Sequence, residues 1–174
     1  MSGVLRDPSH PCAYGDVVVV HEGRGVLAAV RLEPGGVHRS RHGAVPHASW
    51  VGARLGVRLA GAGGKGSVTL LPLTPELWTR TLRHRTQVLY APDVAAVIGG
   101  CSLKPGCVVA ETGTGSGSLS TSLARAVSPH GKLFTFEFHA PRAAAARCVA
   151  TTQDVEMVFA HSISPSFCGY QRRL

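Results

Sequence analysis

Residues 107–119 read CVVAETGTGSGSL, and this stretch decides the fold of the chain. An apolar run ends on the acid Glu111 and leads into a loop with glycines at Gly113, Gly115 and Gly117. We predict a strand over 107–111 and, from the helical spacing of apolar side chains, a helix over 118–127. A strand, a glycine-rich turn and a helix together offer backbone N–H groups and a positive helix end to a ligand.

The segment that follows repeats this pattern. Residues 132–137 form a second apolar run that ends on an acid, Glu137, and residues 140–149 are rich in alanine. Strand, helix, strand and helix at this spacing predict a parallel βαβ unit. Glu137 then lies at the carboxyl end of the second strand, on the same edge of the sheet as the glycine loop. An ordinary surface acid at a strand end remains the alternative interpretation of Glu137.

The spacing of the glycines separates two kinds of nucleotide loop. The dinucleotide pattern G-x-G-x-x-G requires a glycine at position 118, where this chain has Ser118. The form G-x-G-x-G, with an acid two residues before the first glycine, resembles the first motif of Rossmann-like methyltransferases. That resemblance implies that S-adenosylmethionine (AdoMet) lies over the loop and that Glu137 accepts hydrogen bonds from its ribose. A glycine turn that only packs a helix on a strand is the alternative.

The rest of the chain is organised around this unit. We expect an N-terminal tail over 1–12, a β-rich domain over 13–73, the first half of a Rossmann-like domain over 74–150 and a divergent segment over 151–174. In the β-rich part we expect strands over 14–21, 25–32, 38–43, 49–59 and 67–73, which predict a small barrel or sandwich. Thr74 and Pro75 predict a helix start, and a second helix is expected from 91 or 92 to 98, ended by Gly99 and Gly100.

The composition of the chain favours certain kinds of binding partner and certain cellular compartments. The formal net charge of +8 favours polyanions, with nucleic acid first and membrane surfaces second. The five cysteines include no C-x-x-C pair, which indicates reduced, mostly buried thiols in the cytosol or nucleus rather than a zinc site or disulfides. We expect no metal ion. No apolar run approaches the roughly 20 residues that span a bilayer, so no membrane partner is expected either.

Several segments in one order carry a narrower resemblance. Residues 75–78, 84–90, 111–119 and 136–139, with Arg41-His42-Gly43 upstream, resemble the catalytic subunit of tRNA (adenine-58-N1)-methyltransferase. The resemblance covers about residues 13–150. It implies an α/β chain with a small N-terminal β-barrel-like domain, followed by a partial Rossmann-like AdoMet-dependent methyltransferase domain.

The family resemblance also implies a function. It implies methyl transfer from AdoMet to N1 of adenine 58 in the tRNA T-loop, and at similar sites in mRNA. It implies tRNA and a non-catalytic RNA-binding subunit as partners in a heterotetramer, and a nuclear location with the cytoplasm as the alternative. The cofactor-binding residues that it implies are Gln87, Leu89, Glu111, Gly113, Gly115, Ser116, Gly117, Ser118, Leu119, Glu137, Arg142 and Asp154.

The chain departs from the family beyond residue 150. Asp154 stands in a Gln-Asp pair like the family's adenine contact, but it follows the alanine-rich helix too soon. His161 or Ser162 falls where the family has its catalytic Asp, so no catalytic residue is assigned. Because half of a parallel sheet leaves apolar surface uncovered, we expect marginal stability and little catalysis without a partner.

Three functional hypotheses follow from these patterns. The first is an active tRNA methyltransferase subunit. The second is a catalytically inactive truncated isoform or retrocopy of that subunit, which acts as a partner-binding module. The third is a protein or small-molecule methyltransferase, against which residues 84–90 and the β-rich domain argue.

Two further pairs of residues carry expectations of their own. His84 and Arg85 are expected to position RNA or cofactor, or only to cap a loop. Trp50 and Trp78 are expected to be packing residues.

Overall fold

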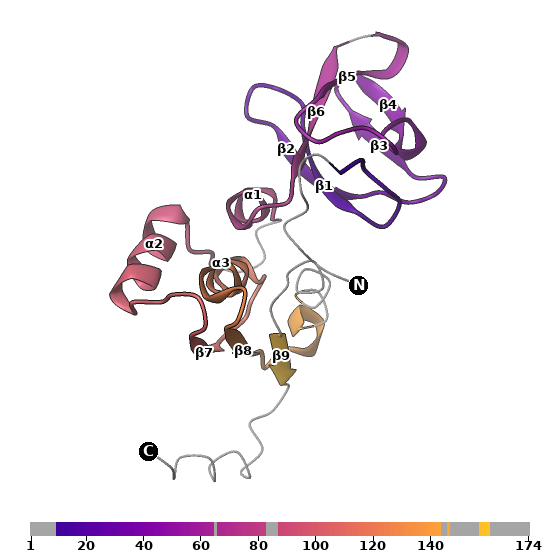
Figure 1. Ribbon diagram of the computed structural model, residues 1–174. Coiled ribbons are helices and arrows are strands. Elements are labelled where there is room, and N and C mark those ends of the chain that lie inside the picture. The colour runs from indigo at the N-terminus through magenta and orange to yellow at the C-terminus, as the bar shows by residue number, and fades with distance from the viewer. Residues whose placement is uncertain (1–9, 65, 83–86, 144–145, 147–156, 161–174) are drawn as a thin grey trace, which may run out of the picture. The chain divides into compact units, whose positions relative to one another are not determined.

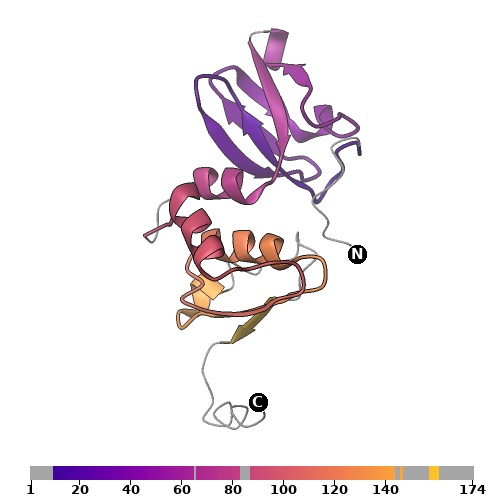
Figure 2. The same cartoon turned by 60° about the vertical axis from the view of Figure 1, so that its left-hand side comes forward.

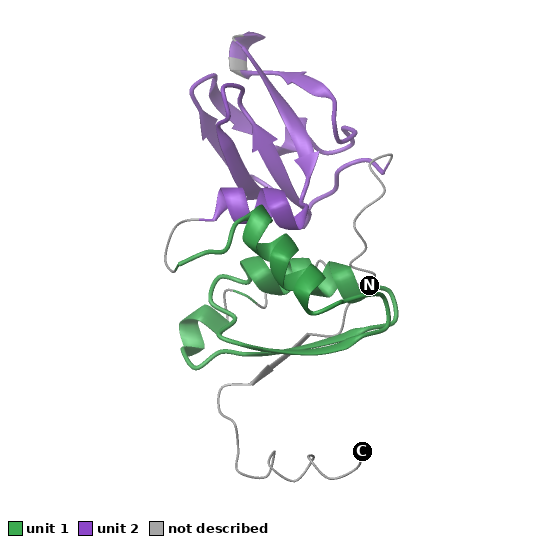
Figure 3. Ribbon diagram, turned by 90° about the vertical axis from the view of Figure 1, so that its left-hand side faces the viewer, with its two compact units in different colours: residues 1–3, 84–174 green, residues 4–83 purple. Residues whose placement is uncertain are grey.

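The computed structural model describes residues 10–64, 66–82, 87–143, 146 and 157–160. The chain divides into two compact units, an N-terminal one up to Arg83 and a C-terminal one from His84 onward (Figure 3). The helix α1 (Pro75–Thr81) therefore belongs to the N-terminal unit. This division lies ten residues further along the chain than the boundary after residue 73 that the sequence pattern suggests.

The N-terminal unit is built from antiparallel strands (Figure 1). Its main sheet has the order β2-β1-β6-β5, and β3 pairs with β4 in a separate hairpin. Within the described residues no strand pairing joins the hairpin to the main sheet, so closure into a barrel is not seen. The strands are β1 (Val17–His21), β2 (Leu27–Arg31), β3 (Val37–Ser40), β4 (Gly43–Pro46), β5 (Arg58–Ala60) and β6 (Ser67–Pro72), with 3₁₀ turns at His47–Ser49 and Ala62–Gly64.

The two faces of the main sheet are covered differently. One face carries the core of the unit, in which Val18, Val20 and Leu70 pack around Trp50, whose exposed fraction is 1%. On the other face α1 packs against β1 and β2, and Val19 between them is fully buried. Alternation along β1 therefore sends successive valines to opposite faces. The expectation that Trp50 is a packing residue is confirmed.

Two of the expected strands are wrong, and glycine explains both. Residues 38–43 are not one strand but the end of β3, a turn at Arg41-His42 and the start of β4 at Gly43, whose φ is 99°. Residues 49–59 contain only the first two residues of the short strand β5, because Gly52 and Gly56 adopt φ of 84° and 82°. Both values lie in the left-handed region, which interrupts an extended chain.

The C-terminal unit contains the expected parallel βαβ arrangement. The strands β7 (Val108–Thr112), β8 (Lys132–Phe136) and β9 (Met157–Ala160) form a parallel sheet in the order β7-β8-β9. The helix α3 (Ser118–Val127) connects β7 to β8 and packs on both strands, and α2 (Ala91–Gly100) lies beside α3 (Figure 2). Helix α2 includes Gly99 and Gly100, which were expected to end it. Of the expected helix over 140–149, residues 140–143 and 146 are described, and they are helical.

A small apolar cluster lies between α3 and the sheet. Leu123, Ala124 and Val127 on α3 pack on Leu133 of β8, which is fully buried. The turn that leads into β8 is tight, since a Cβ on Gly131 would lie 2.4 Å from the carbonyl oxygen of Val127. Only glycine fits there, so the close approach of α3 and β8 depends on it.

The helices are short. Helix α1 has 7 residues, and α2 and α3 have 10 each. In the described part of the chain no helix has the length and apolar character needed to cross a membrane.

Candidate functional site

The glycine loop joins β7 to α3 through three left-handed residues. Gly113, Gly115 and Gly117 have φ of 85°, 58° and 76°. The N–H groups of Gly113 and Thr114 both donate to the carbonyl oxygen of Phe136, at 2.8 and 3.2 Å. These two backbone bonds fix the loop to the carboxyl end of β8. Gly117 is the N-cap of α3 and supplies no side-chain hydrogen bond to the first N–H groups of the helix.

Space lies open beside the first glycine. Among the described residues other than its chain neighbours, a Cβ placed on Gly113 would meet no atom within 4 Å, whereas one on Gly117 would meet the Cβ of Ala146 at 3.8 Å. Gly113 is thus not required by close packing within the described chain. Its left-handed backbone and the free space above it are the features that let a ligand approach the backbone closely.

Glu137 connects the end of β8 to this loop. Its carboxylate is 4% exposed, and Oε2 accepts a hydrogen bond from the N–H of Gly115 at 2.8 Å. Oε1 accepts from the N–H of His139 at 2.8 Å and from Nε and Nη2 of Arg142 at 3.2 and 3.0 Å. A carboxylate offers about four acceptor positions. Oε1 is saturated by these bonds, while Oε2 can accept a further donor.

These bonds also set the charge of Glu137. Burial acts to raise the pKa of the carboxyl, but the N–H groups of His139 and Gly115 and the guanidinium of Arg142 outweigh burial and lower the pKa. Glu137 is therefore an anion at neutral pH, held against the loop and ready to accept hydroxyl donors. A ribose diol presents donors of that kind.

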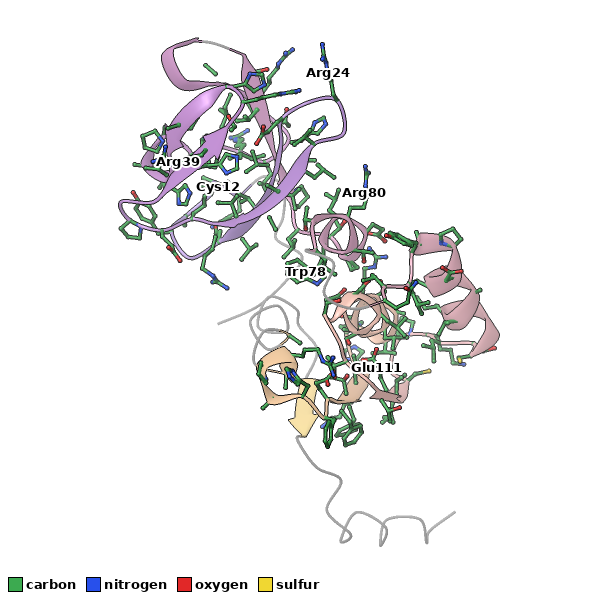
Figure 4. The ribbon with its side chains drawn as sticks, turned by 180° about the vertical axis from the view of Figure 1, so that it is seen from behind. Cys12, Arg24, Arg39, Trp78, Arg80 and Glu111 are labelled. Carbon is green, nitrogen blue, oxygen red and sulfur yellow. The ribbon has the colours of Figure 1, made fainter. Side chains whose placement is uncertain are left out.

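Glu111, which is labelled in Figure 4, lies in a buried cluster of hydroxyl groups. Its Oε2 accepts from Oγ of Ser120 at 2.5 Å and from Oγ1 of Thr135 at 2.6 Å. Oγ1 of Thr135 also lies 2.5 Å from Oγ1 of Thr114. Burial raises the pKa of Glu111, and the two hydroxyl donors partly oppose that shift.

The hydrogen bonds of this cluster have a fixed direction. A hydroxyl has a single hydrogen. Thr135 gives its hydrogen to the carboxylate of Glu111, so Thr114 must donate to Thr135. Thr114 stands between Gly113 and Gly115, and its hydroxyl is thereby held by the carboxylate of Glu111 through Thr135. The cluster positions the loop from beneath and presents no group to the open side.

The structure brings together only part of the residue set expected from the sequence. Gly115, Glu137 and Arg142 meet as described, and Oγ of Ser118 donates to the carbonyl oxygen of Leu89 at 3.4 Å. Leu119 packs against the apolar core of the unit. Gln87 is exposed, Ser116 is half-buried, and Asp154, His84 and Arg85 lie outside the described residues.

Three members of the hydroxyl cluster were not expected from the sequence, namely Thr114, Ser120 and Thr135. Thr135 interrupts the otherwise apolar run Leu133–Phe136 and lies opposite Glu111 in the β7–β8 register. A polar residue at a buried strand position, paired with an acid on the neighbouring strand, is the signal that points to such a cluster.

Metal-binding patterns and thiols add little to this site. In the described ranges no group of three or more His, Cys, Asp or Glu side chains is placed to hold a metal ion. Cys12 is buried, but Cys101 is exposed and Cys107 half-buried, so the expectation of mostly buried thiols is wrong for Cys101. Both described cysteines of the C-terminal unit are free thiols, and neither is in the glycine loop.

The fold and the loop define the class of protein. A SAM-dependent O-methyltransferase from Thermotoga maritima superposes with a TM-score of 0.77 at 20% identity, over 91% of this chain and 60% of that one. A tRNA (m1A58) methyltransferase from Aquifex aeolicus gives a TM-score of 0.67 at 19% identity, over 88% and 60%. The chain therefore has the Rossmann-like α/β fold of AdoMet-dependent methyltransferases.

The family is narrower than the fold. Residues 66–162 match the family described as tRNA methyltransferase complex GCD14 subunit, and the chain belongs to that family. The tRNA (adenine(58)-N(1))-methyltransferase catalytic subunit of Dictyostelium discoideum is 41% identical over 143 residues, and that of Schizosaccharomyces pombe 42% over 139. These alignments cover 82% and 80% of this chain but 46% and 38% of the relatives, so the chain spans less than half of their length.

Proposed function

We propose that this chain binds AdoMet at the glycine loop and belongs to a methyltransferase that modifies N1 of adenine 58 in tRNA. The observation that carries the proposal is the anionic Glu137, held on the N–H of Gly115 beside an open loop, in a chain of this family. AdoMet supplies the activated methyl group and its leaving group. The protein's contribution is to bind the cofactor, orient it and exclude water.

Each part of the site has its own task in this proposal. Oε2 of Glu137 is the acceptor for a ribose hydroxyl, because Oε1 is already filled by His139 and Arg142. Gly113 lets the backbone approach the cofactor without a Cβ between them. Glu111 and its hydroxyl cluster hold Thr114 in place and do not touch the cofactor.

The substrate and the partner are also proposals. The net charge of +8 suits a polyanion such as tRNA. We propose tRNA as the substrate, similar sites in mRNA as further ones, and a non-catalytic RNA-binding subunit as the partner in a heterotetramer. We also propose a nuclear location, with the cytoplasm as the alternative, which imaging of a tagged chain tests.

A second function is favoured by the residues at 161 and 162. The family resemblance places the catalytic Asp there, and this sequence has His161 and Ser162. A chain that binds AdoMet and its partner without transferring a methyl group fits that difference. The two functions share the cofactor site and differ in the chemical step.

Two measurements distinguish these functions. Calorimetry measures AdoMet binding by the purified chain, and methylation of a T-loop RNA is then measured with and without the partner subunit. AdoMet binding with methylation supports the enzyme, while binding without methylation in either condition supports the partner-binding module. If AdoMet does not bind even with the partner present, the proposed cofactor site is wrong.

A further inference from the structure

The N-terminal unit contains a pocket far from the glycine loop in sequence. The pocket measures about 350 Å³ and lies where four segments meet, namely the end of β1, the β3–β4 turn, β5 and β6. Its lining includes the polar residues His21, Glu22, Arg41, His42, Arg58 and Ser67. Every one of them belongs to the same compact unit, so the pocket is a feature of that unit alone.

Two guanidinium groups give the pocket its charge. Arg58 is exposed on β5 and its Nε donates to Oγ of Ser67 at 2.5 Å. Arg41 is exposed on the turn between β3 and β4; its Nη2 donates to the carbonyl oxygen of Glu22 and its Nε lies 3.2 Å from Nε2 of His42. Each guanidinium has five N–H donors, so both keep donors for a ligand. Among the described residues no carboxylate forms an ion pair with either.

The acid in the lining is already engaged. The carboxylate of Glu22 is 7% exposed, and its Oε1 lies 3.0 Å from Nε2 of His38. Glu22 offers Arg41 its backbone oxygen and not its carboxylate. Neither guanidinium is paired with this carboxylate, and with Arg41, Arg58 and Glu22 counted together the lining keeps an excess of positive charge.

Two glycines make room for these side chains. A Cβ on Gly66 would lie 2.0 Å from Nδ1 of His42, so the imidazole rests directly on the glycine backbone. A Cβ on Gly23 would lie 3.0 Å from Nη2 of Arg41. The position of His42 thus depends on glycine at 66, whereas at 23 the end of the flexible Arg41 side chain would have to move by only a few tenths of an ångström.

We propose that this pocket binds a phosphate group of the RNA backbone. The guanidinium groups of Arg41 and Arg58 match phosphate oxygens through paired N–H donors, and the hydroxyls of Ser67 and Thr69 can donate as well. A backbone phosphate carries no base identity, so the contact adds affinity and register without sequence selection. The inference rests on the proposed tRNA substrate, because the pocket is proposed as one of the places where that RNA is bound.

The test compares three arginines in the full chain. Binding of a labelled T-loop RNA hairpin is measured by fluorescence anisotropy over a range of salt concentrations, for Arg58→Ala, Arg58→Glu, Arg41→Ala and the control Arg39→Ala. Arg39 is exposed on β3 and does not line the pocket (Figure 4). Its substitution by alanine removes one positive charge, as do Arg41→Ala and Arg58→Ala. We expect each pocket variant to lose several-fold more affinity than the control, with the salt slope reduced by about 1 for each arginine lost.

The same experiment contains the results that overturn the proposal. Equal losses for Arg58→Glu and Arg39→Ala, or no RNA binding by the unaltered chain at low salt, exclude a phosphate site here. Inorganic phosphate is added as a competitor; if it binds at the pocket while the variants bind RNA normally, the RNA assignment is wrong. AdoMet binding is measured in parallel on the same variants, without and with the partner subunit, and absence means no binding in either condition. Its absence refutes the proposed cofactor site and leaves the RNA comparison valid.

Discussion

At the scale of single residues, the glycine loop makes the most direct prediction. Gly113→Ala meets no steric clash, but it places a Cβ on a left-handed residue and in the open space above the loop. We expect a backbone cost of about 1 kcal/mol in stability and a loss of AdoMet affinity of at least tenfold. Calorimetric titration with AdoMet measures the affinity.

Gly106→Ala is the matched control for this substitution. Gly106 has φ of 90° and likewise has no atom within 4 Å of an added Cβ, but it lies in the turn before β7. The two variants should lose similar stability. Only Gly113→Ala should lose AdoMet affinity, and an equal loss in both would assign the effect to general destabilisation.

Glu111 predicts how stability depends on pH. Burial raises its pKa, so the folded state keeps the proton to higher pH than the unfolded chain does. Its contribution to stability is full below the unfolded value of 4.5 and is lost as pH rises through the raised pKa of the folded state. Glu111→Gln cannot ionise, so its free energy of unfolding should fall less above that value. Urea unfolding at several pH values measures this, and parallel curves for both proteins would contradict it.

Glu137 acts in the opposite direction. Its pKa is lowered in the folded state, so its stabilising contribution is present above 4.5 and is lost as pH falls through the lower, folded pKa. The two carboxyls therefore act in different pH ranges, one above 4.5 and the other below it. This separation lets the effect of Glu111→Gln be read above pH 4.5 without interference from Glu137.

At the scale of elements, the start of α1 can be tested alone. Oγ1 of Thr74 accepts the N–H of Leu77 at 3.3 Å, and Pro75 occupies the first turn. Thr74→Ala should cost about 1 kcal/mol of stability in the N-terminal unit. Thr81→Ala, on the same helix, removes only a bond to the carbonyl oxygen of Trp78 and should cost less. Urea unfolding followed by circular dichroism compares them; equal costs would mean that the cap stabilises the helix no more than the Thr81 bond does.

The elements also show what sequence patterns can and cannot predict. The start of α1 and both ends of α3 follow from local signals, which is why Thr74 and residues 118–127 were predicted correctly. The strands over 38–43 and 49–59 were wrong because the backbone conformation of glycines such as Gly43 and Gly56 decides them. Alternation of apolar residues does not reveal whether a glycine adopts positive φ.

The candidate site divides in the same way. The loop glycines and Glu137 belong to one motif with a fixed spacing, so they can be predicted from the sequence alone. The hydroxyl cluster requires the register that pairs Glu111 with Thr135. The pocket that contains Arg41 and Arg58 requires four segments to meet. Both depend on tertiary contacts between residues that are distant in sequence. Local sequence patterns do not reveal such contacts.

At the scale of the whole molecule, the two units have separate cores. Leu70 lies in the core of the N-terminal unit and Leu133 in that of the C-terminal unit, both fully buried, and the two clusters share no residue. Leu70→Ala should cost about 2–5 kcal/mol and should loosen the N-terminal unit first. Leu133→Ala is its counterpart and should do the reverse, with loss of AdoMet affinity. Hydrogen exchange followed by mass spectrometry resolves the units, and equal deprotection of both by either variant would refute this prediction.

The positions of the tryptophans have a practical consequence. Both tryptophans of the chain, Trp50 in the core and Trp78 on α1, belong to the N-terminal unit. Intrinsic indole fluorescence therefore reports on the N-terminal unit, while the glycine loop and the parallel sheet contain no tryptophan. The native chain thus has an intrinsic fluorescent probe in its N-terminal unit. A difference between its fluorescence and circular dichroism melting curves directly measures how far the two halves unfold apart.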